Sequence, residues 1–175
     1  MWKMRVRITY PTIMEIRKSI HKKDAGIVRS IAASTGFFRE DEVEVAVELL
    51  QEALARGTDS GYFFLFAEQG GETLGFTCFG PTPCTLGSWD LYWIVVSNEF
   101  RGQGIGKRLL AEAENTVREA GGRKLFIETS SGETYLPTRE FYIRSGYQEE
   151  ARIKDFYRDG DDKLIYSQRI TRPTG

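Results

Sequence analysis

The apolar run Trp89-Asp90-Leu91-Tyr92-Trp93-Ile94-Val95-Val96 is followed, four residues later, by Arg101-Gly102-Gln103-Gly104-Ile105-Gly106. Its aromatic and β-branched residues predict a strand over Trp89 to Val96. Beyond the glycines an amphipathic helix is predicted from about Gly104 to Ala120, because apolar residues recur every four positions at Ile105, Leu109, Ala113 and Val117. The segment therefore predicts a strand, a glycine turn and a helix in direct succession.

The glycine turn has the chemistry of an anion site. A helix that begins there presents unpaired backbone amides and the positive end of its dipole. We expect Gly102, Gly104 and Gly106 to adopt left-handed backbone angles and to leave room for phosphate oxygens. The turn predicts a phosphate cradle, although a tight helix start alone would explain the same residues.

Two nucleotide-binding motifs compete for this turn. A P-loop would need glycine at 101 and serine or threonine at 108, and both positions are arginine. A dinucleotide site gains support from Glu128, which ends the next predicted strand where an acid would bind a ribose. Lys107, however, stands where that motif needs its third glycine. The P-loop is rejected, and a dinucleotide-binding protein is kept as the weaker alternative.

The rest of the chain extends this pattern to both sides. Further strands are predicted over 13–18, 62–68, 73–79, 124–129, 147–157 and 163–170. Further helices are predicted over 24–34, 41–56 and 136–144. The order is βααβββαβαββ, which suits an α+β domain with a mixed, largely antiparallel central sheet flanked by helices.

Composition and charge exclude several classes of protein. The chain has 175 residues, a hydrophobic fraction of 41% and no linker or repeat, so we expect a single domain over residues 1–175. A net charge of -1 disfavours nucleic acid or a membrane as partner. The start, Met1–Arg7, is too charged for a signal peptide, so a cytoplasmic location is expected. With two cysteines and the surface residue His21 as the one histidine, no protein-built metal site is expected.

Two motifs together resemble one known family. Arg101 to Gly106 is similar to the Q/R-x-x-G-x-G/A signature of the GNAT superfamily of N-acetyltransferases. The run Phe141-Tyr142-Ile143-Arg144-Ser145-Gly146-Tyr147 is similar to the second signature of that family, F-Y-x-x-x-G-F/Y. Both occur in the expected order, and the order of predicted elements resembles the family from Ile13 to Ile170.

The resemblance implies an enzyme that uses acetyl-CoA as its acyl donor and no metal. It implies that the turn binds the pyrophosphate of CoA through Arg101, Gly102, Gln103, Gly104, Ile105, Gly106 and Lys107. It also implies that the pantetheine arm pairs with the backbone of Ile94, Val95 and Val96, which places no demand on their side chains. Tyr142 matches the family tyrosine that protonates the departing thiolate, and a phenol is protonated at neutral pH.

Asp90 is the candidate general base. It lies eleven positions before Arg101, where some family members carry a glutamate that accepts the proton of the amine. On a regular strand Asp90 would share a face with Tyr92, Ile94 and Val96, an apolar setting that would favour proton uptake. Asp90 would equally serve to hold a loop amide. Glu128, on the adjacent strand, is the reserve base.

The acceptor is left open. The family's asparagine seven positions before the tyrosine is Tyr135 here, so its contact to pantetheine is not transferred. The acceptor channel of the family implies roles for Phe37, Phe38, Asp155, Phe156 and Tyr157, which suit a small cationic amine or a peptide amine. A non-catalytic CoA-binding module is the alternative function, and a homodimer and a donor other than acetyl stay open.

Overall fold

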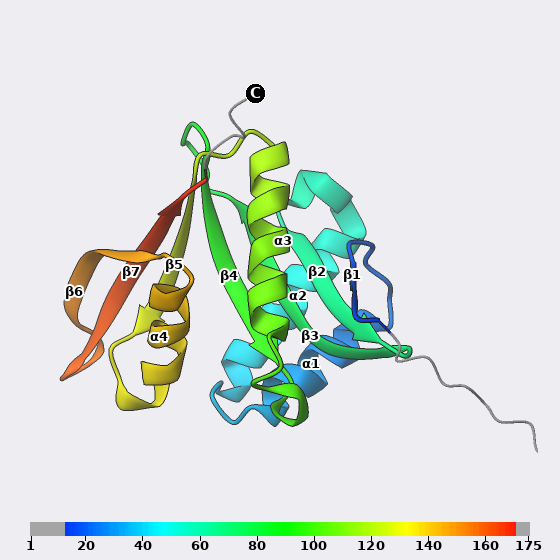
Figure 1. The fold of residues 1–175 in the computed structure, drawn as a ribbon, viewed down its shortest axis with the longest axis horizontal. Helices are drawn as coiled ribbons and strands as arrows, with labels where there is room; N and C mark the ends of the chain where they lie inside the picture. Colours follow the sequence, from blue (N-terminus) through cyan, green and yellow to red (C-terminus); the bar gives the residue numbers. More distant parts are fainter. Residues whose placement is uncertain (1–12, 171–175) are drawn as a thin grey trace, which may run out of the picture.

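The computed structural model describes residues 13–170. They form one seven-stranded sheet in the order β1-β2-β3-β4-β5-β7-β6, with helices on both faces (Figure 1). The strands and α-helices follow one another as predicted: β1 (Glu15–Arg17), α1 (Asp24–Ser34), α2 (Glu40–Arg56), β2 (Phe63–Gln69), β3 (Glu72–Pro81), β4 (Ser88–Val96), α3 (Ile105–Glu119), β5 (Lys124–Ser130), α4 (Leu136–Arg144), β6 (Gln148–Arg158) and β7 (Asp161–Arg169). None of these helices is long and apolar enough to cross a bilayer.

Several predicted boundaries differ from the structure by one or two residues, and two of the differences have a clear cause. The first strand is limited to Glu15–Arg17 because only these residues pair with β2. The strand predicted from Tyr147 begins at Gln148, since the Tyr147 amide donates to the Tyr142 carbonyl at 3.0 Å and closes the end of α4. The charged start Met1–Arg7, with the prediction that depends on it, lies outside the described residues.

Each face of the sheet has its own apolar core. On one face, α3 and α4 pack on the sheet through a cluster that includes Leu109, Leu91 and Tyr142. On the other face, α1 and α2 pack through a second cluster that includes Leu50 and Val95. The amphipathic periodicity of α3 explains its position, because all four residues predicted to form the apolar stripe are buried, together with Leu110. The sheet is therefore covered by two separate layers of helix.

The parallel pair that α3 connects is short. Strand β4 pairs with β5 from Ser88, opposite Lys124, to Leu91, opposite Ile127. Beyond Leu91 the two strands separate, and Figure 1 shows them diverging toward the end of the molecule where the β4–α3 turn lies. The two strands thus form a V-shaped opening in the sheet, here called the splay. Its closed end is the pair Leu91 and Ile127, and its open end is at the β4–α3 turn.

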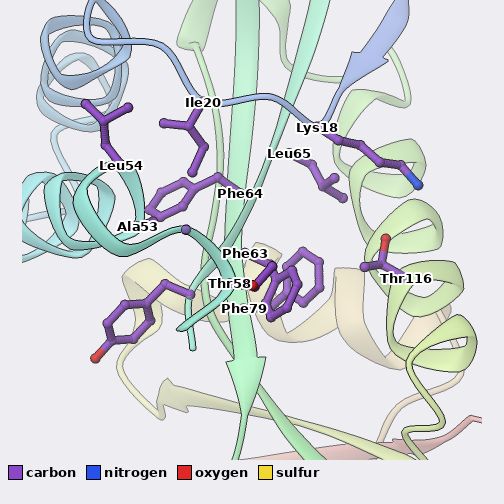
Figure 2. A pocket seen from close by; sticks show the side chains of 12 residues that line it. Lys18, Ile20, Ala53, Leu54, Thr58, Phe63, Phe64, Leu65, Phe79 and Thr116 are labelled. Carbon is purple, nitrogen blue, oxygen red and sulfur yellow. The ribbon is translucent and has the colours of Figure 1, made fainter. Parts of the chain in front are cut away.

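A groove of about 360 Å³ lies elsewhere, at the β2 edge of the sheet (Figure 2). It exists because β1 covers only Phe66–Glu68 and leaves the first half of β2 as an open edge. Its walls are largely apolar, with aromatic rings that include Phe63 and Phe79, and Lys18 and Thr116 lie on the side of α3. None of its lining residues belongs to β4, the glycine turn or α4.

Candidate active site

Strand β4 has a free backbone edge along the splay. From Trp93 to Val96 it pairs with β3 but has no partner on β5. Ile94 and Val96 contact the core beneath α3, and Val95 is buried beneath α1 and α2. The side chains of these three residues fill the two cores, and their backbone is left available to an extended ligand.

A bulge in β4 lies next to the closed end of the splay. Leu91 lies opposite Phe79 and Trp93 opposite Cys78, so Tyr92 is an extra residue between them. A bulge of this kind interrupts the pairing and reorients the side chains that follow. The ring of Tyr92 packs edge-on against Tyr62 at 5.7 Å, on the α1/α2 face. Burial, together with the charge of Asp90, raises the pKa of Tyr92 to about 12.

The glycine turn presents its amides at the open end of the splay. Gly102 and Gly104 have positive φ angles of 77° and 78°, as expected, and no atom lies within 4 Å of where a Cβ would stand. Gly106 differs from the prediction, because it lies within the first turn of α3 with a helical backbone. An added Cβ would stand 3.6 Å from the Phe141 ring, an ordinary contact, so packing at this position does not require glycine.

The start of α3 presents free backbone amides and positive charge, both of which favour an anion. Gly104 is its N-cap and makes no side-chain cap, and the first turn contains no acidic residue. The first intrahelical backbone bond here is that of the Arg108 amide to the Gly104 carbonyl, at 3.1 Å. The amides of Ile105, Gly106 and Lys107 thus have no helical acceptor. Lys107 and Arg108 add positive charge where a helix usually carries acids.

The remaining turn residues have separate roles. Ile105 is 3% exposed and anchors the helix start in the α3 core. Gln103 and Lys107 are exposed. The Arg101 guanidinium lies 4.7 Å from the centre of the Phe37 ring. Partial desolvation lowers the pKa of Arg101.

Tyr142 lies at the closed end of the splay, on the α3/α4 face. It is 4% exposed, and its ring centre is 6.4 Å from that of Tyr166. Tyr166 pairs with Ile127, the last β5 residue that pairs with β4. Burial raises the pKa of the Tyr142 phenol above its ordinary value. Within residues 13–170 its hydroxyl makes no hydrogen bond, so the proton is not engaged in the fold.

Asp90 also lies next to the closed end of the splay, but on the opposite face of the sheet from Tyr142. Trp89 and Leu91 point into the α3 core, so Asp90 between them points toward the α1/α2 face. The expectation that it shares a face with Ile94 and Val96 is wrong, because the Tyr92 bulge shifts the alternation. Its carboxylate accepts a hydrogen bond from the Thr82 hydroxyl at 2.6 Å.

Glu128 is also close to the closed end of the splay. It follows Ile127 on β5 and therefore points to the same face as Asp90. Its carboxylate pairs with the Lys163 ammonium, and its side chain is 52% exposed. Burial raises the pKa of Tyr157, and the negative charges of Glu128 and Glu42 raise it further. Tyr142 on one face and two carboxylates on the other thus flank the point where the strands part.

Two features near the closed end of the splay were not indicated by the sequence pattern: the bulge at Tyr92 and the ion pair of Lys163 with Glu128. Tyr92 sits in an unbroken apolar run, which carries no sign of a bulge. Lys163 could have been suspected only from its place on the final strand beside Glu128. In residues 13–170 no three histidine, cysteine or acidic side chains gather as a set of metal ligands.

Comparison with known proteins identifies the family of the chain. The profile of the acetyltransferase (GNAT) family matches residues 28–147. An uncharacterized N-acetyltransferase of Methanocaldococcus jannaschii is 27% identical over 117 residues, which are 64% of this chain and 69% of that protein. The matched residues include the glycine turn. The chain belongs to the GNAT family.

Solved structures show the same architecture. A crystal structure from Desulfovibrio desulfuricans, assigned to the GNAT family, is 46% identical and has a TM-score of 0.89, covering 91% of this chain and 100% of that one. An aminoglycoside 6'-N-acetyltransferase complexed with coenzyme A is 16% identical with a TM-score of 0.73, covering 92% of this chain and 99% of that one. The predicted family and fold are therefore confirmed.

Proposed function

We propose that this protein transfers an acetyl group from acetyl-CoA directly to a primary amine. The proposal rests on the groups that lie at the two ends of the splay. Its open end holds an amide-lined turn suited to phosphates, and its closed end holds Tyr142 and the carboxylates. An extended ligand that carries a pyrophosphate at one end and a thioester at the other fits both.

Acetyl-CoA has the chemistry that this surface requires. The amides at the start of α3, with Lys107 and Arg101, suit the pyrophosphate of CoA. The free edge of Ile94–Val96 suits the amide groups of pantetheine, which can pair with it as an added strand would. The CoA held by the structurally similar aminoglycoside acetyltransferase supports this assignment.

The reaction needs two proton transfers, one from the amine and one to the thiolate. Residues at the closed end of the splay provide them from opposite faces of the sheet. From the α1/α2 face the amine nitrogen attacks the acetyl carbonyl, and Asp90, directly or through water, accepts the proton that the amine loses. As the carbon–sulfur bond breaks, Tyr142 donates its proton to the sulfur from the α3/α4 face. Glu128 is the alternative base. Its partner Lys163 makes it less available, whereas Asp90 is held only by a neutral hydroxyl.

The acceptor we propose is an amine on a small cationic molecule or a peptide. Glu128 lies on the face that the amine would approach, and the negative charges of Glu128 and Glu42 both contribute, after burial, to the raised pKa of Tyr157. Negative charge attracts an ammonium group, and aromatic faces bind cations. The proposal is tested by incubating the protein with acetyl-CoA and a panel of amines while free thiol is measured. Thiol release that requires one amine supports it, and CoA binding without any transfer would favour a non-catalytic CoA-binding module.

The first prediction concerns ligand-induced stability. CoA or acetyl-CoA should raise the melting temperature, while NAD and ATP should not, because the turn lacks the other groups of those nucleotide sites. At a concentration of 100 times Kd, binding adds about 2.7 kcal/mol, which corresponds to roughly 5–10 °C for a domain of this size. Differential scanning fluorimetry measures it. Stabilisation by NAD with none by CoA would overturn the proposed function.

A second prediction concerns Gly104. Replacing Gly104 with alanine should weaken CoA binding about tenfold, because the Cβ enters the open space before the amides and the residue must keep φ near 78°. Isothermal titration calorimetry gives the affinity. Gly160→Ala is a matched control, since Gly160 has φ 79° and open space in the β6–β7 turn. It should cost similar stability without loss of CoA affinity, and an unchanged affinity in folded Gly104→Ala would exclude this residue from the site.

A further inference from the structure

The loop between α1 and α2, Thr35–Arg39, is attached to both arms of the splay. On the β4 side, the Asn98 side-chain amide donates to the Ser34 carbonyl at 2.6 Å, just before the loop. Phe38 packs edge-on against Trp93 with ring centres 4.8 Å apart. On the β5 side, Phe37 lies 6.1 Å from Tyr135, the residue just before α4. Figure 1 shows this loop at the same end of the molecule as the β4–α3 turn.

Arg101 is the basic residue that connects this loop to the glycine turn. It directly precedes Gly102, and its guanidinium stacks on Phe37 at 4.7 Å. Within residues 13–170 it has neither an ion pair nor a hydrogen bond, unlike Arg17 and Arg39, which pair with acids. An unpaired, partly desolvated guanidinium attracts an anion more strongly than one already bound to a carboxylate.

Resting on the proposed function, we propose that Phe37 is a positioning residue for the donor substrate: its ring holds the Arg101 guanidinium beside the glycine turn, where Arg101 pairs with a phosphate of acetyl-CoA. The ring supplies a face for the cation without neutralising its charge. Tyr135 also packs against Phe37, with ring centres 6.1 Å apart, and so helps to hold the ring from the β5 arm. Because Arg101 is already oriented, phosphate binding immobilises less of its side chain.

The test compares ligands with and without phosphates. Phe37→Leu should weaken CoA binding roughly 3- to 10-fold, the size expected when one cation–aromatic contact is lost. Binding of S-acetylpantetheine, which has no phosphate, should not change when followed by NMR titration. In the active enzyme the KM for acetyl-CoA should rise while kcat stays the same. Phe37→Tyr, which keeps an aromatic face, should restore the affinity.

Three controls isolate the contact. Phe38→Leu removes the other aromatic ring of the loop, which packs on Trp93 and not on Arg101, and should leave CoA affinity unchanged. The double variant Phe37→Leu with Arg101→Gln should bind CoA no more weakly than Arg101→Gln alone, since the ring acts through the guanidinium. Phe37→Met keeps apolar bulk and serves in place of leucine if the leucine variant does not fold.

Two results would overturn the inference. One is a folded Phe37→Leu or Phe37→Met variant that binds CoA as tightly as the parent. The other is an equal loss of affinity for CoA and S-acetylpantetheine, which would mean that the ring shapes the channel rather than positions the cation. A parent protein that binds no CoA is a different outcome, because it would overturn the proposed function before any variant is compared.

Discussion

Replacing Tyr142 with phenylalanine should lower kcat by roughly 100-fold or more while CoA affinity barely changes. The substitution keeps the ring that packs against Tyr147 and Tyr166 and removes only the hydroxyl. That hydroxyl has no partner within residues 13–170, so its loss should leave the fold intact. Because burial raises the pKa of Tyr142, the phenol stays protonated and remains a donor at neutral pH.

The measurement is steady-state kinetics with an identified amine, together with CoA titrations of both proteins. The loss should appear in kcat with little change in the KM for acetyl-CoA, as expected for an interaction made mainly in the transition state. Tyr166→Phe is the matched control, because it removes a hydroxyl from the same aromatic cluster and should retain turnover. Turnover of Tyr142→Phe within twofold of the parent would show that water or another group protonates the thiolate.

The fold could be predicted because its signals are local. The four-residue periodicity of α3 and the glycines that end and begin helices depend only on neighbouring residues. The element order followed from these signals, and it excluded a chain of βαβ units. The glycine turn was equally readable, since left-handed angles at Gly102 and Gly104 require glycine and a helix start exposes its amides.

The details of the site depend on contacts between distant residues, which is why the sequence did not reveal them. The run from Leu91 to Val96 is apolar throughout, so the bulge at Tyr92 leaves no break in the pattern. That one extra residue turned Asp90 to the face opposite Ile94. The stacking of Arg101 on Phe37 likewise joins two loops far apart in the chain. A cation and a ring carry no sequence pattern that links them.

Replacing Asp90 with asparagine should reduce kcat/KM for the amine at least 100-fold at neutral pH, if Asp90 accepts the proton. Asparagine has nearly the same shape, and its carbonyl oxygen can still accept the 2.6 Å hydrogen bond of Thr82. Only the basicity is removed. The defect should shrink as pH rises, because a larger fraction of the amine is then already neutral, so one proton fewer must be removed before it attacks. Rates of thiol release measured across pH test both statements.

Two variants distinguish the base from its neighbours. Glu128→Gln removes the other carboxylate at the closed end of the splay, whose partner is Lys163, and should retain activity within a few-fold if Asp90 is the base. Thr82→Val removes the hydroxyl that holds Asp90 and should cost less than Asp90→Asn, because the carboxylate remains. A 100-fold loss in Glu128→Gln with near-normal Asp90→Asn would transfer the role of base to Glu128. Asp90 would then be a structural acid that holds the loop after β3, since its bond to Thr82 joins that loop to β4.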